Sequence, residues 1–113
     1  MTLDDGPCFC ADHRQTVHHL QWCVKARSAL AKAAPAGIDI YFDNVGGDIL
    51  DAVLLHLNPN ARVPVCGQIS QYNLTDRQGL RNVGVFLDKC VMLQGFRIGN
   101  HLKRRDEALD ELL

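Results

Sequence analysis

Apolar residues along this chain alternate between helical spacing and short continuous runs. Residues 26–33 carry apolar side chains at helical spacing, and Pro35 with Gly37 stops the run. Residues 38–42 are mostly β-branched or aromatic, a pattern typical of a buried strand. The pattern therefore predicts a helix that ends near residue 33 and a buried strand over residues 38–42.

The next segment repeats this helix-and-strand pattern. Residues 44–47 read as a turn, and Asp48 suits the positive amino-terminal end of a helix. Residues 58–60 end that helix, and residues 62–66 form the next predicted strand, closed by Gly67. Pro64 is awkward there, because proline removes a ladder donor and favours an edge or a bulge. The predicted apolar face of the helix consists of Ile49, Leu50, Val53, Leu54 and Leu57.

The carboxyl-terminal third predicts one more strand between two helices. A polar loop over residues 68–78 precedes a helix over 80–90, and residues 91–96 form the strand. Asn100 is placed to cap a last helix that runs to Leu113. Strands that alternate with helices imply parallel βαβ units. We therefore expect an α/β protein of three layers, with about three parallel strands flanked by helices in a partial Rossmann arrangement.

Composition excludes several classes of function. At 113 residues the chain is one domain at most. Lys and Arg total 12 against 13 Asp and Glu, which gives a net charge of -1 and no support for nucleic-acid binding. The apolar runs are too short to span a membrane. Asp4 and Asp5 argue against a secretory signal at the amino terminus.

The five cysteines indicate a reducing environment. Their count is odd and no Cys-x-x-Cys pair occurs, so we expect free thiols and a cytoplasmic protein. A metal-binding module near the amino terminus is an alternative, but its spacings do not match the paired ligands of structural zinc. We therefore predict no metal site. The residues of that alternative are Cys8, Cys10, His13, His18, His19 and Cys23.

Two polar turns follow the first two predicted strands. Asn44 to Gly47 comes after the first strand, and Gly67 opens a polar segment after the second. In a parallel sheet the carboxyl ends of neighbouring strands share one edge, where α/β proteins bind nucleotides. Asn44 could contact such a ligand or merely form the turn. The glycines could allow close approach of a ligand or simply make the turn tight.

These motifs resemble those of a known family. Asp43-Asn44-Val45-Gly46-Gly47, followed by Cys66-Gly67-Gln68-Ile69-Ser70-Gln71-Tyr72-Asn73, is similar to the zinc-independent medium-chain dehydrogenase/reductases, and within them to the NADP-dependent alkenal, prostaglandin and curcumin reductases. The strand Leu93-Gln94-Gly95-Phe96 also fits. The resemblance covers residues 26–112 and implies that residues 26–113 form the second half of an NADP-binding Rossmann domain. Residues 1–25 match nothing in that family and are expected to be a separate, disordered segment.

The resemblance implies a site for NADPH and a reaction. Such enzymes transfer hydride from NADPH to the β-carbon of an α,β-unsaturated carbonyl, and the α-carbon is then protonated. Tyr72 would bind the nicotinamide ribose and act in catalysis. The implied cofactor-binding residues are Asn44, Cys66, Gly67, Gln68, Ile69, Ser70, Gln71, Tyr72, Phe96, Arg97 and Ile98.

Each of these candidates also has a simpler reading. A phenol is protonated near neutral pH, so Tyr72 could donate to a developing enolate, or it could merely pack on its loop. Cys66 ends a predicted strand and is expected to be a buried small hydrophobe rather than a nucleophile. Ser70 has no recognisable His and Asp partners for a hydrolase triad. Residues 103–105 are most simply a solvated helix face.

The sequence also departs from the family pattern. No two glycines are separated by one residue, so Gly-x-Gly-x-x-Gly, the loop that would hold the pyrophosphate, does not occur. The segment before residue 26 has no counterpart of the substrate domain, which favours a truncated, mobile or frameshifted gene. We therefore expect a fragment of an enone-reducing oxidoreductase that is inactive alone. The alternative is a non-catalytic α/β module that forms homo-oligomers through the exposed edge at residues 38–42.

Overall fold

The structure is a computed structural model that describes residues 17–113. Helices and strands alternate through most of this range, as the sequence predicts. The elements are α1 (Val17–Ala33), β1 (Ile38–Ile40), α2 (Gly47–Leu54), β2 (Leu57–Val65), the 3-10 helix η1 (Ile69–Gln71), α3 (Gly84–Asp88), β3 (Met92–Gly95), the 3-10 helix η2 (Ile98–Arg104) and α4 (Arg105–Leu112).

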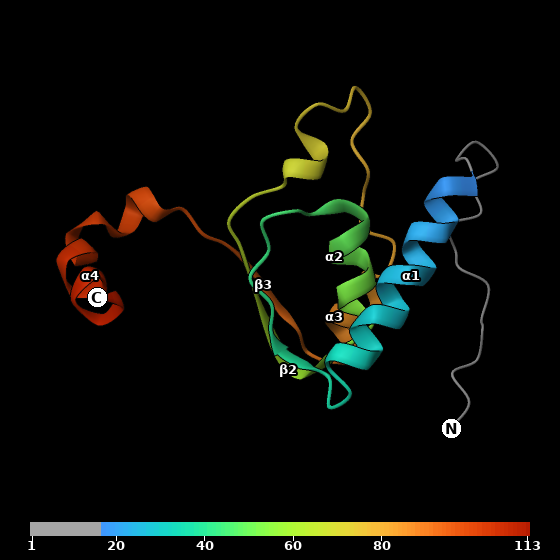
Figure 1. Cartoon of the computed structure of the whole chain (residues 1–113), viewed down its shortest axis with the longest axis horizontal. Coiled ribbons are helices and arrows are strands. Elements are labelled where there is room, and N and C mark those ends of the chain that lie inside the picture. Colours follow the sequence, from blue (N-terminus) through green and yellow to red (C-terminus); the bar gives the residue numbers. More distant parts are fainter. Residues whose placement is uncertain (1–16) are drawn as a thin grey trace.

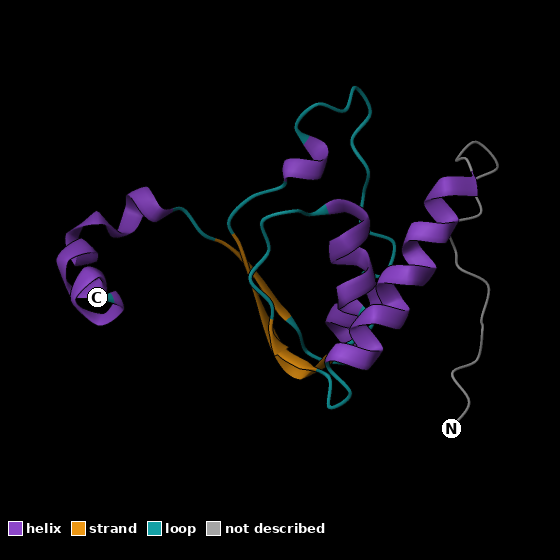
Figure 2. Ribbon diagram, in the orientation of Figure 1, coloured by secondary structure: helices purple, strands orange, loops and turns teal. Residues whose placement is uncertain are grey.

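The three strands form one parallel sheet in the order β1-β2-β3 (Figure 2). β2 is therefore central, and β1 and β3 are the edges of the sheet that the structure describes. β2 and β3 pair in continuous register from Arg62 opposite Met92 to Val65 opposite Gly95. The predicted α/β class with a parallel sheet flanked by helices is confirmed.

The core lies between the sheet and the helices α1, α2 and α3, which occupy one side of it (Figure 1). Leu50, Val53 and Leu54 of α2 are each no more than 2% exposed. Their spacing of three and four residues puts them on one face of the helix. From β2 the core takes Leu57, Ala61 and Val63, and around it pack Leu30, Ile38, Tyr41, Val65, Leu80, Phe86 and Val91.

Several element boundaries differ from those predicted. α1 begins at Val17, well before residue 26. Leu57 begins β2 instead of closing the helix, so that strand starts five positions before the predicted residue 62 and includes Pro59. The predicted helix over residues 80–90 shortens to α3, and the last predicted helix divides into η2 and α4. Asn100 lies inside η2 and caps no helix.

Pro64 lies on the central strand, and its effect appears on the side that faces β1. Its carbonyl accepts a hydrogen bond from the Asp43 amide at 2.9 Å, but its own nitrogen has no hydrogen to return. The β1–β2 pairing is irregular between Ile38 and Ile40, and an isolated bridge joins Asp43 to Val65. The register shift lies opposite residues 57–62, before Pro64, and Pro64 pairs in regular register with Gln94. The strand that carries Pro64 is therefore not an edge, and its bulge is not at the proline.

The predicted burial of the first strand is wrong. Ile40 is 58% exposed and Phe42 is 50% exposed. They lie on the face of the sheet opposite the core, because alternate residues of a strand point to opposite faces. An open groove of about 260 Å³ runs over this face, lined by Ile40, Arg62, Val63, Pro64, Met92 and Gln94. We call the surface formed by Ile40, Phe42, Pro64 and Met92 the open face.

The carboxyl-terminal segment forms an arm that extends away from the sheet (Figure 1). It consists of η2 and α4, which pack against each other. The predicted solvated face at residues 103–105 is confirmed, because these residues are exposed and Arg104 pairs with Glu107 at 2.7 Å. Among residues 17–113, no helix is long and apolar enough to cross a membrane.

Candidate functional site

The two polar turns predicted from the sequence lie together at the carboxyl ends of β1 and β2. The main-chain carbonyl of Asp43 accepts hydrogen bonds from the amides of Cys66 (2.8 Å) and Gly67 (3.1 Å). Further along, the Ile69 amide donates to the carbonyl of Asn44 at 3.2 Å. The turn after β1 and the loop after β2 are thus joined through their backbones, as expected for neighbouring parallel strands.

Asp43 anchors this junction, and the sequence did not single it out. Its side chain is fully buried, and Oδ1 accepts hydrogen bonds from the amides of Val45 (3.1 Å) and Gly46 (3.0 Å) and from the hydroxyl of Tyr41 (3.3 Å). Oδ2 is buried without a partner among the residues described. The pKa of the Tyr41 phenol rises to about 12, chiefly because of burial and also because of the charge and hydrogen bond of Asp43. Tyr41 therefore stays a hydrogen-bond donor at neutral pH.

Glycines let the two turns approach each other closely. Gly46 and Gly47 have φ angles of 68° and 55°, in the left-handed region that favours glycine, which supports the tight-turn reading. A Cβ on Gly67 would lie 3.1 Å from the carbonyl oxygen of Asn44 and 3.2 Å from the hydroxyl of Tyr72. Gly67 thus fills a narrow space between the Asn44 main chain and the Tyr72 hydroxyl, which has no room for a larger side chain.

Tyr72 lies on the surface beside this space. Its side chain is 62% exposed, and its hydroxyl oxygen accepts a hydrogen bond from the Gln68 amide at 2.9 Å. Tyr72 thus contacts its own loop through its hydroxyl, while most of its side chain remains exposed. The phenolic hydrogen has no acceptor within residues 17–113 and can point outward to a ligand. Asn44 is likewise exposed.

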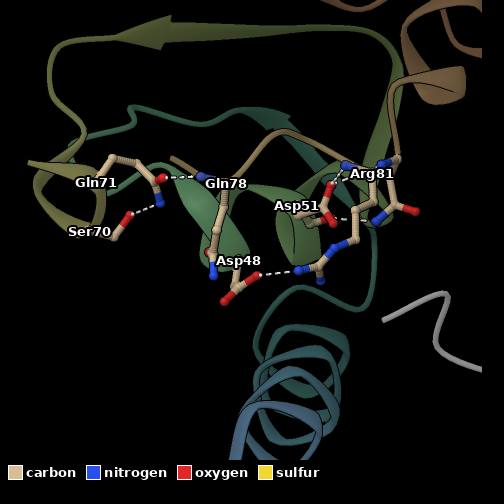
Figure 3. Close-up of polar contacts among 7 residues, drawn as sticks. Asp48, Asp51, Ser70, Gln71, Gln78 and Arg81 are labelled. Carbon is tan, nitrogen blue, oxygen red and sulfur yellow. Dashed lines mark hydrogen bonds and ion pairs between the residues drawn. The ribbon is translucent and has the colours of Figure 1, made fainter. Parts of the chain in front are cut away.

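Ser70 and Gln71 have structural roles in the loop (Figure 3). The Ser70 hydroxyl donates to the Val45 carbonyl at 2.6 Å and accepts from the Gln71 amide group at 3.0 Å. Gln71 is only 5% exposed, and its Oε1 accepts from the Gln78 amide at 2.8 Å. These two predicted cofactor residues therefore hold the loop in place, and their polar atoms are engaged within the chain.

A second set of polar contacts ties the far end of the same loop to α2 (Figure 3). Asp51 is 7% exposed, and its Oδ1 accepts from the amides of Arg81 (2.8 Å) and Asn82 (2.9 Å). The Arg81 guanidinium pairs with Asp48 at 3.4 Å. The segment between Gln71 and Asn82 is thus fixed at both ends.

One of the predicted residue environments needs correction, that of Cys66. Cys66 is exposed, not buried, because it continues the strand alternation that puts Arg62 and Pro64 on the open face. Phe96 follows β3 and donates its amide to Val65 at 2.8 Å, next to the end of β2. Its ring stacks on His101 at 5.0 Å and meets Phe42 edge-on at 6.0 Å. Arg97 and Ile98 are exposed at the start of the arm.

The junction of the two turns gathers exposed polar residues at the carboxyl edge of the sheet. Gly67 packs closely against the Asn44 main chain and the Tyr72 hydroxyl, and Asn44 and Tyr72 are both exposed there. The sequence holds no glycine-rich loop for the pyrophosphate. On the opposite side of the loop, a pocket of about 250 Å³ lies between α2, β3 and the residue 77–80 segment. The residues present therefore offer exposed polar groups at this edge of the sheet but no glycine-rich loop for the phosphates.

The amino-terminal metal alternative falls largely outside the part of the chain that can be described. Cys8, Cys10 and His13 precede residue 17, and the side chains of His18, His19 and Cys23 are not described. Within the described range, no group of three or more His, Cys, Asp or Glu side chains is arranged to hold a metal ion.

A parallel sheet with paired polar turns at its carboxyl edge defines a Rossmann-like α/β fold, and comparison with known proteins agrees. No family model matches the sequence. The NADPH-dependent curcumin reductase of Escherichia coli is 51% identical over 82 residues, which is 67% of this chain and 24% of that protein. The NADP-dependent 2-alkenal reductase of Nicotiana tabacum is 46% identical over 71 residues, 63% of this chain and 21% of that protein.

Solved structures give the same result. CurA of Vibrio vulnificus matches with a TM-score of 0.62 and 44% identity, over 72% of this chain and 26% of that one. Its complex with NADPH matches with a TM-score of 0.55 and 47% identity, over 62% of this chain and 22% of that one. The chain is therefore homologous to part of the NADP-dependent alkenal and curcumin reductases, which confirms the resemblance of its loop motifs. It spans between 20% and 26% of the length of such relatives.

Proposed function

We propose that this chain forms the nicotinamide-ribose side of an NADPH site in an oxidoreductase that reduces the C=C bond of α,β-unsaturated carbonyls. The observation that carries the proposal is the close packing at Gly67, which brings the exposed Asn44 and Tyr72 together at the carboxyl edge of the parallel sheet. Relatives with matching sequence are named as NADP-dependent alkenal and curcumin reductases, which supports the choice of cofactor and substrate class. Zinc takes no part in this proposal.

Tyr72 and Asn44 have distinct roles in the proposed site. NADPH, when bound, supplies the hydride. The Tyr72 phenol is exposed, and its oxygen already accepts from Gln68, so its hydrogen is available for donation to a ligand. There it would donate to the ribose or to the oxygen of a developing enolate, and such stabilisation of growing charge lowers barriers strongly. The Asn44 amide group would bind the nicotinamide side of the cofactor.

The chain by itself supplies only part of this site. We propose that it binds NADPH weakly and does not turn over an enone, because residues 1–113 contain neither the glycine-rich loop nor a recognisable substrate domain. Loss of those contacts leaves little to offset the entropy of binding, so we expect a dissociation constant on the order of 1 mM, or ~4 kcal/mol of binding free energy.

Amide-resolved NMR tests both parts of the proposal. Titration of the labelled chain with NADP⁺ should shift the amides of Asn44, Gly67, Gln68 and Tyr72, and leave those of α4 unchanged. NAD⁺ at the same concentrations shows whether the 2′-phosphate contributes. Shifts confined to other surfaces would reject the site. In a parallel assay, enone-dependent oxidation of NADPH by the chain well above background would reject the proposed inactivity.

A second candidate function is supported by the open face. This surface exposes Ile40, Phe42 and Met92 on a single side of the sheet, where 50% or more of each side chain is accessible. Exposed apolar groups next to unpaired strand edges favour association with another strand or sheet. The chain would then act as a non-catalytic, homo-oligomeric α/β module. Light scattering that finds only a monomer at high concentration would argue against this candidate.

A further inference from the structure

We propose that Asp43 is a positioning residue for the nicotinamide-ribose wall, and this inference rests on the proposed function. The Asp43 side chain does not reach the exposed surface of the site, because it is fully buried. It acts instead on the two segments that form the site. Through its side chain it holds the turn that carries Asn44, and through its main chain it holds the loop that carries Gly67.

The side chain fixes the turn after β1. Oδ1 receives the amides of Val45 and Gly46 at 3.1 and 3.0 Å, which closes a local turn around Asn44. The Tyr41 hydroxyl donates to the same oxygen at 3.3 Å and so fixes the orientation of the carboxylate. Gly46 has a φ of 68°, so the turn depends on a conformation that few residues adopt and that the two amide bonds stabilise.

The main chain of Asp43 also holds the loop after β2 through hydrogen bonds. Its amide donates to the Pro64 carbonyl at 2.9 Å, and its carbonyl accepts from Cys66 and Gly67. The Gly67 amide is held at 3.1 Å by that carbonyl, which places Gly67 against Asn44 and Tyr72. A rotation of the Asp43 peptide would therefore move both walls of the narrow space together.

The cost of burying this carboxylate supports a specific role. Oδ2 has no partner in the described part of the chain, and an unpaired buried oxygen is expensive for stability. An apolar residue at this position would avoid that cost but could not accept from two amides. An Asn would keep the accepting oxygen. The requirement at position 43 is therefore an acceptor aimed at the turn.

Two substitutions separate positioning from general stabilisation. Asp43→Ala removes the acceptor, whereas Asp43→Asn keeps it on a side chain of the same shape. Asp51→Ala is the matched control, because Asp51 is also buried and also accepts from two amides, those of Arg81 and Asn82. Amide hydrogen exchange followed by NMR reports each site separately and needs no ligand.

We expect Asp43→Ala to accelerate exchange about tenfold or more at Val45 and Gly46, which lose hydrogen bonds to a charged group worth about 1.5–3 kcal/mol each. Exchange at Cys66 and Gly67 should rise as well, because the main-chain carbonyl that accepts from them is positioned by the same turn. Asp43→Asn should stay within about threefold of wild type at the same amides, as expected if the acceptor is what matters. Asp51→Ala should affect Arg81 and Asn82 and leave Cys66 and Gly67 unchanged. If Asp43→Ala does not fold, Asp43→Ser replaces it and should show a smaller loss at the same amides.

The inference is wrong if Asp43→Ala leaves Cys66 and Gly67 protected, if Asp51→Ala exposes the same amides, or if Asp43→Asn fails to restore them. The NADP⁺ titration of the same variants adds a second readout. Asp43→Ala should weaken the shifts at Gln68 and Tyr72 about tenfold in ligand concentration, equal to about 1.4 kcal/mol, with Asp43→Asn close to wild type. If wild type shows no NADP⁺ shifts, the proposed function fails, while the exchange pattern still decides the role of Asp43.

Discussion

Tyr41 and Asp43 form a polar pair beneath the candidate site, and the pair gives the protein a pH dependence in the alkaline range. Burial, then the negative charge and hydrogen bond of Asp43, raise the pKa of the Tyr41 phenol from 10.0 to about 12. In the unfolded chain the phenol ionises near 10, while in the folded chain it keeps its proton until about 12. The stabilising effect is therefore complete below pH 10 and is lost as the pH rises to about 12.

Urea unfolding at a series of pH values checks this first prediction. Above pH 10 the free energy of unfolding of wild type should fall more steeply than that of Tyr41→Phe, which has no phenol to ionise. Other groups that titrate in this range are shared by both proteins, so they cancel in the difference. Parallel curves for the two proteins would show that Tyr41 is not the source of the dependence.

Gly67 offers the second prediction at the residue scale. Gly67→Ala places a Cβ about 3.1 Å from the Asn44 carbonyl and 3.2 Å from the Tyr72 hydroxyl, closer than ordinary contacts, so one of these groups must move. We expect NADP⁺ shifts at Gln68 and Tyr72 to weaken by about tenfold in ligand concentration, or about 1.4 kcal/mol. Gly79→Ala is the matched control, because a Cβ there meets nothing within 4 Å. Equal binding by the two variants would contradict the importance of this space.

Some of these residues could be identified as candidates from the sequence alone, and others could not, for physical reasons. Asn44 and Tyr72 lie in turn motifs that the resemblance identifies directly. Asp43 escaped notice because an aspartate between a strand and a turn is usually solvated, and its burial depends on how the turn, the loop and β2 pack around it. Cys66 was expected to be buried because the sequence does not tell which face of the sheet lacks helices. Local motifs therefore identify the exposed candidates, but burial requires the tertiary structure.

At the element scale, α2 supplies half of the buried core cluster and links it to the site. Leu54 is completely buried, and its helix begins at Gly47 beside the candidate turn. Leu54→Ala should reduce the free energy of unfolding by about 2–5 kcal/mol, since it leaves a cavity where Leu54 packs against β2. That is a large part of the total stability expected of a small domain, about 5–15 kcal/mol. Chemical denaturation monitored by circular dichroism measures the loss.

Ile49 is the control on the same helix. It is 43% exposed and one turn closer to the amino-terminal end, so Ile49→Ala should cost less than about 1 kcal/mol. A similar loss for both variants would mean that α2 is buried on both faces, contrary to the structure. A change in the denaturant slope would instead point to an altered unfolded state.

The elements themselves were more predictable than their ends. The order of helices and strands and the parallel pairing follow from the alternation of apolar patterns. The predicted helix over residues 48–57 is longer than α2, because Leu57 falls at helical spacing after Leu50, Val53 and Leu54. In the structure Leu57 is the first residue of β2. The Leu57 side chain enters the same core from the strand, so the spacing of apolar residues alone does not distinguish a helix from a strand at this position. The helix predicted over residues 80–90 shortens to α3, because only some of its predicted apolar residues lie in the helix and others lie in the preceding loop.

At the scale of the whole molecule, the dominant feature is the contrast between the two faces of the sheet. One face is covered by α1, α2 and α3, and the other exposes apolar side chains beside the arm (Figure 1). The sequence predicted a sheet flanked by helices and a buried first strand. It did not reveal the open face, because β-branched residues look the same whether or not a helix covers them.

This contrast leads to the last prediction, that the chain associates through its open face and that one charge can prevent it. Ile40 is 58% exposed at the edge strand β1, beside the groove that includes Pro64 and Met92. Ile40→Lys would place an ammonium group in any contact made there, and lysine on an edge strand disfavours pairing. We expect wild type to form dimers or larger species as its concentration rises, and Ile40→Lys to remain monomeric, as measured by light scattering.

The control for this prediction is Leu87→Lys, which adds the same charge to an apolar side chain that is 83% exposed on α3, away from the open face. It should associate like wild type, because the charge lies outside the proposed contact. If both lysine variants were monomeric, net charge rather than the open face would control association. If wild type stayed monomeric throughout, the exposed apolar face would be tolerated in solution, and the oligomeric module would be ruled out in favour of the reductase-derived site alone.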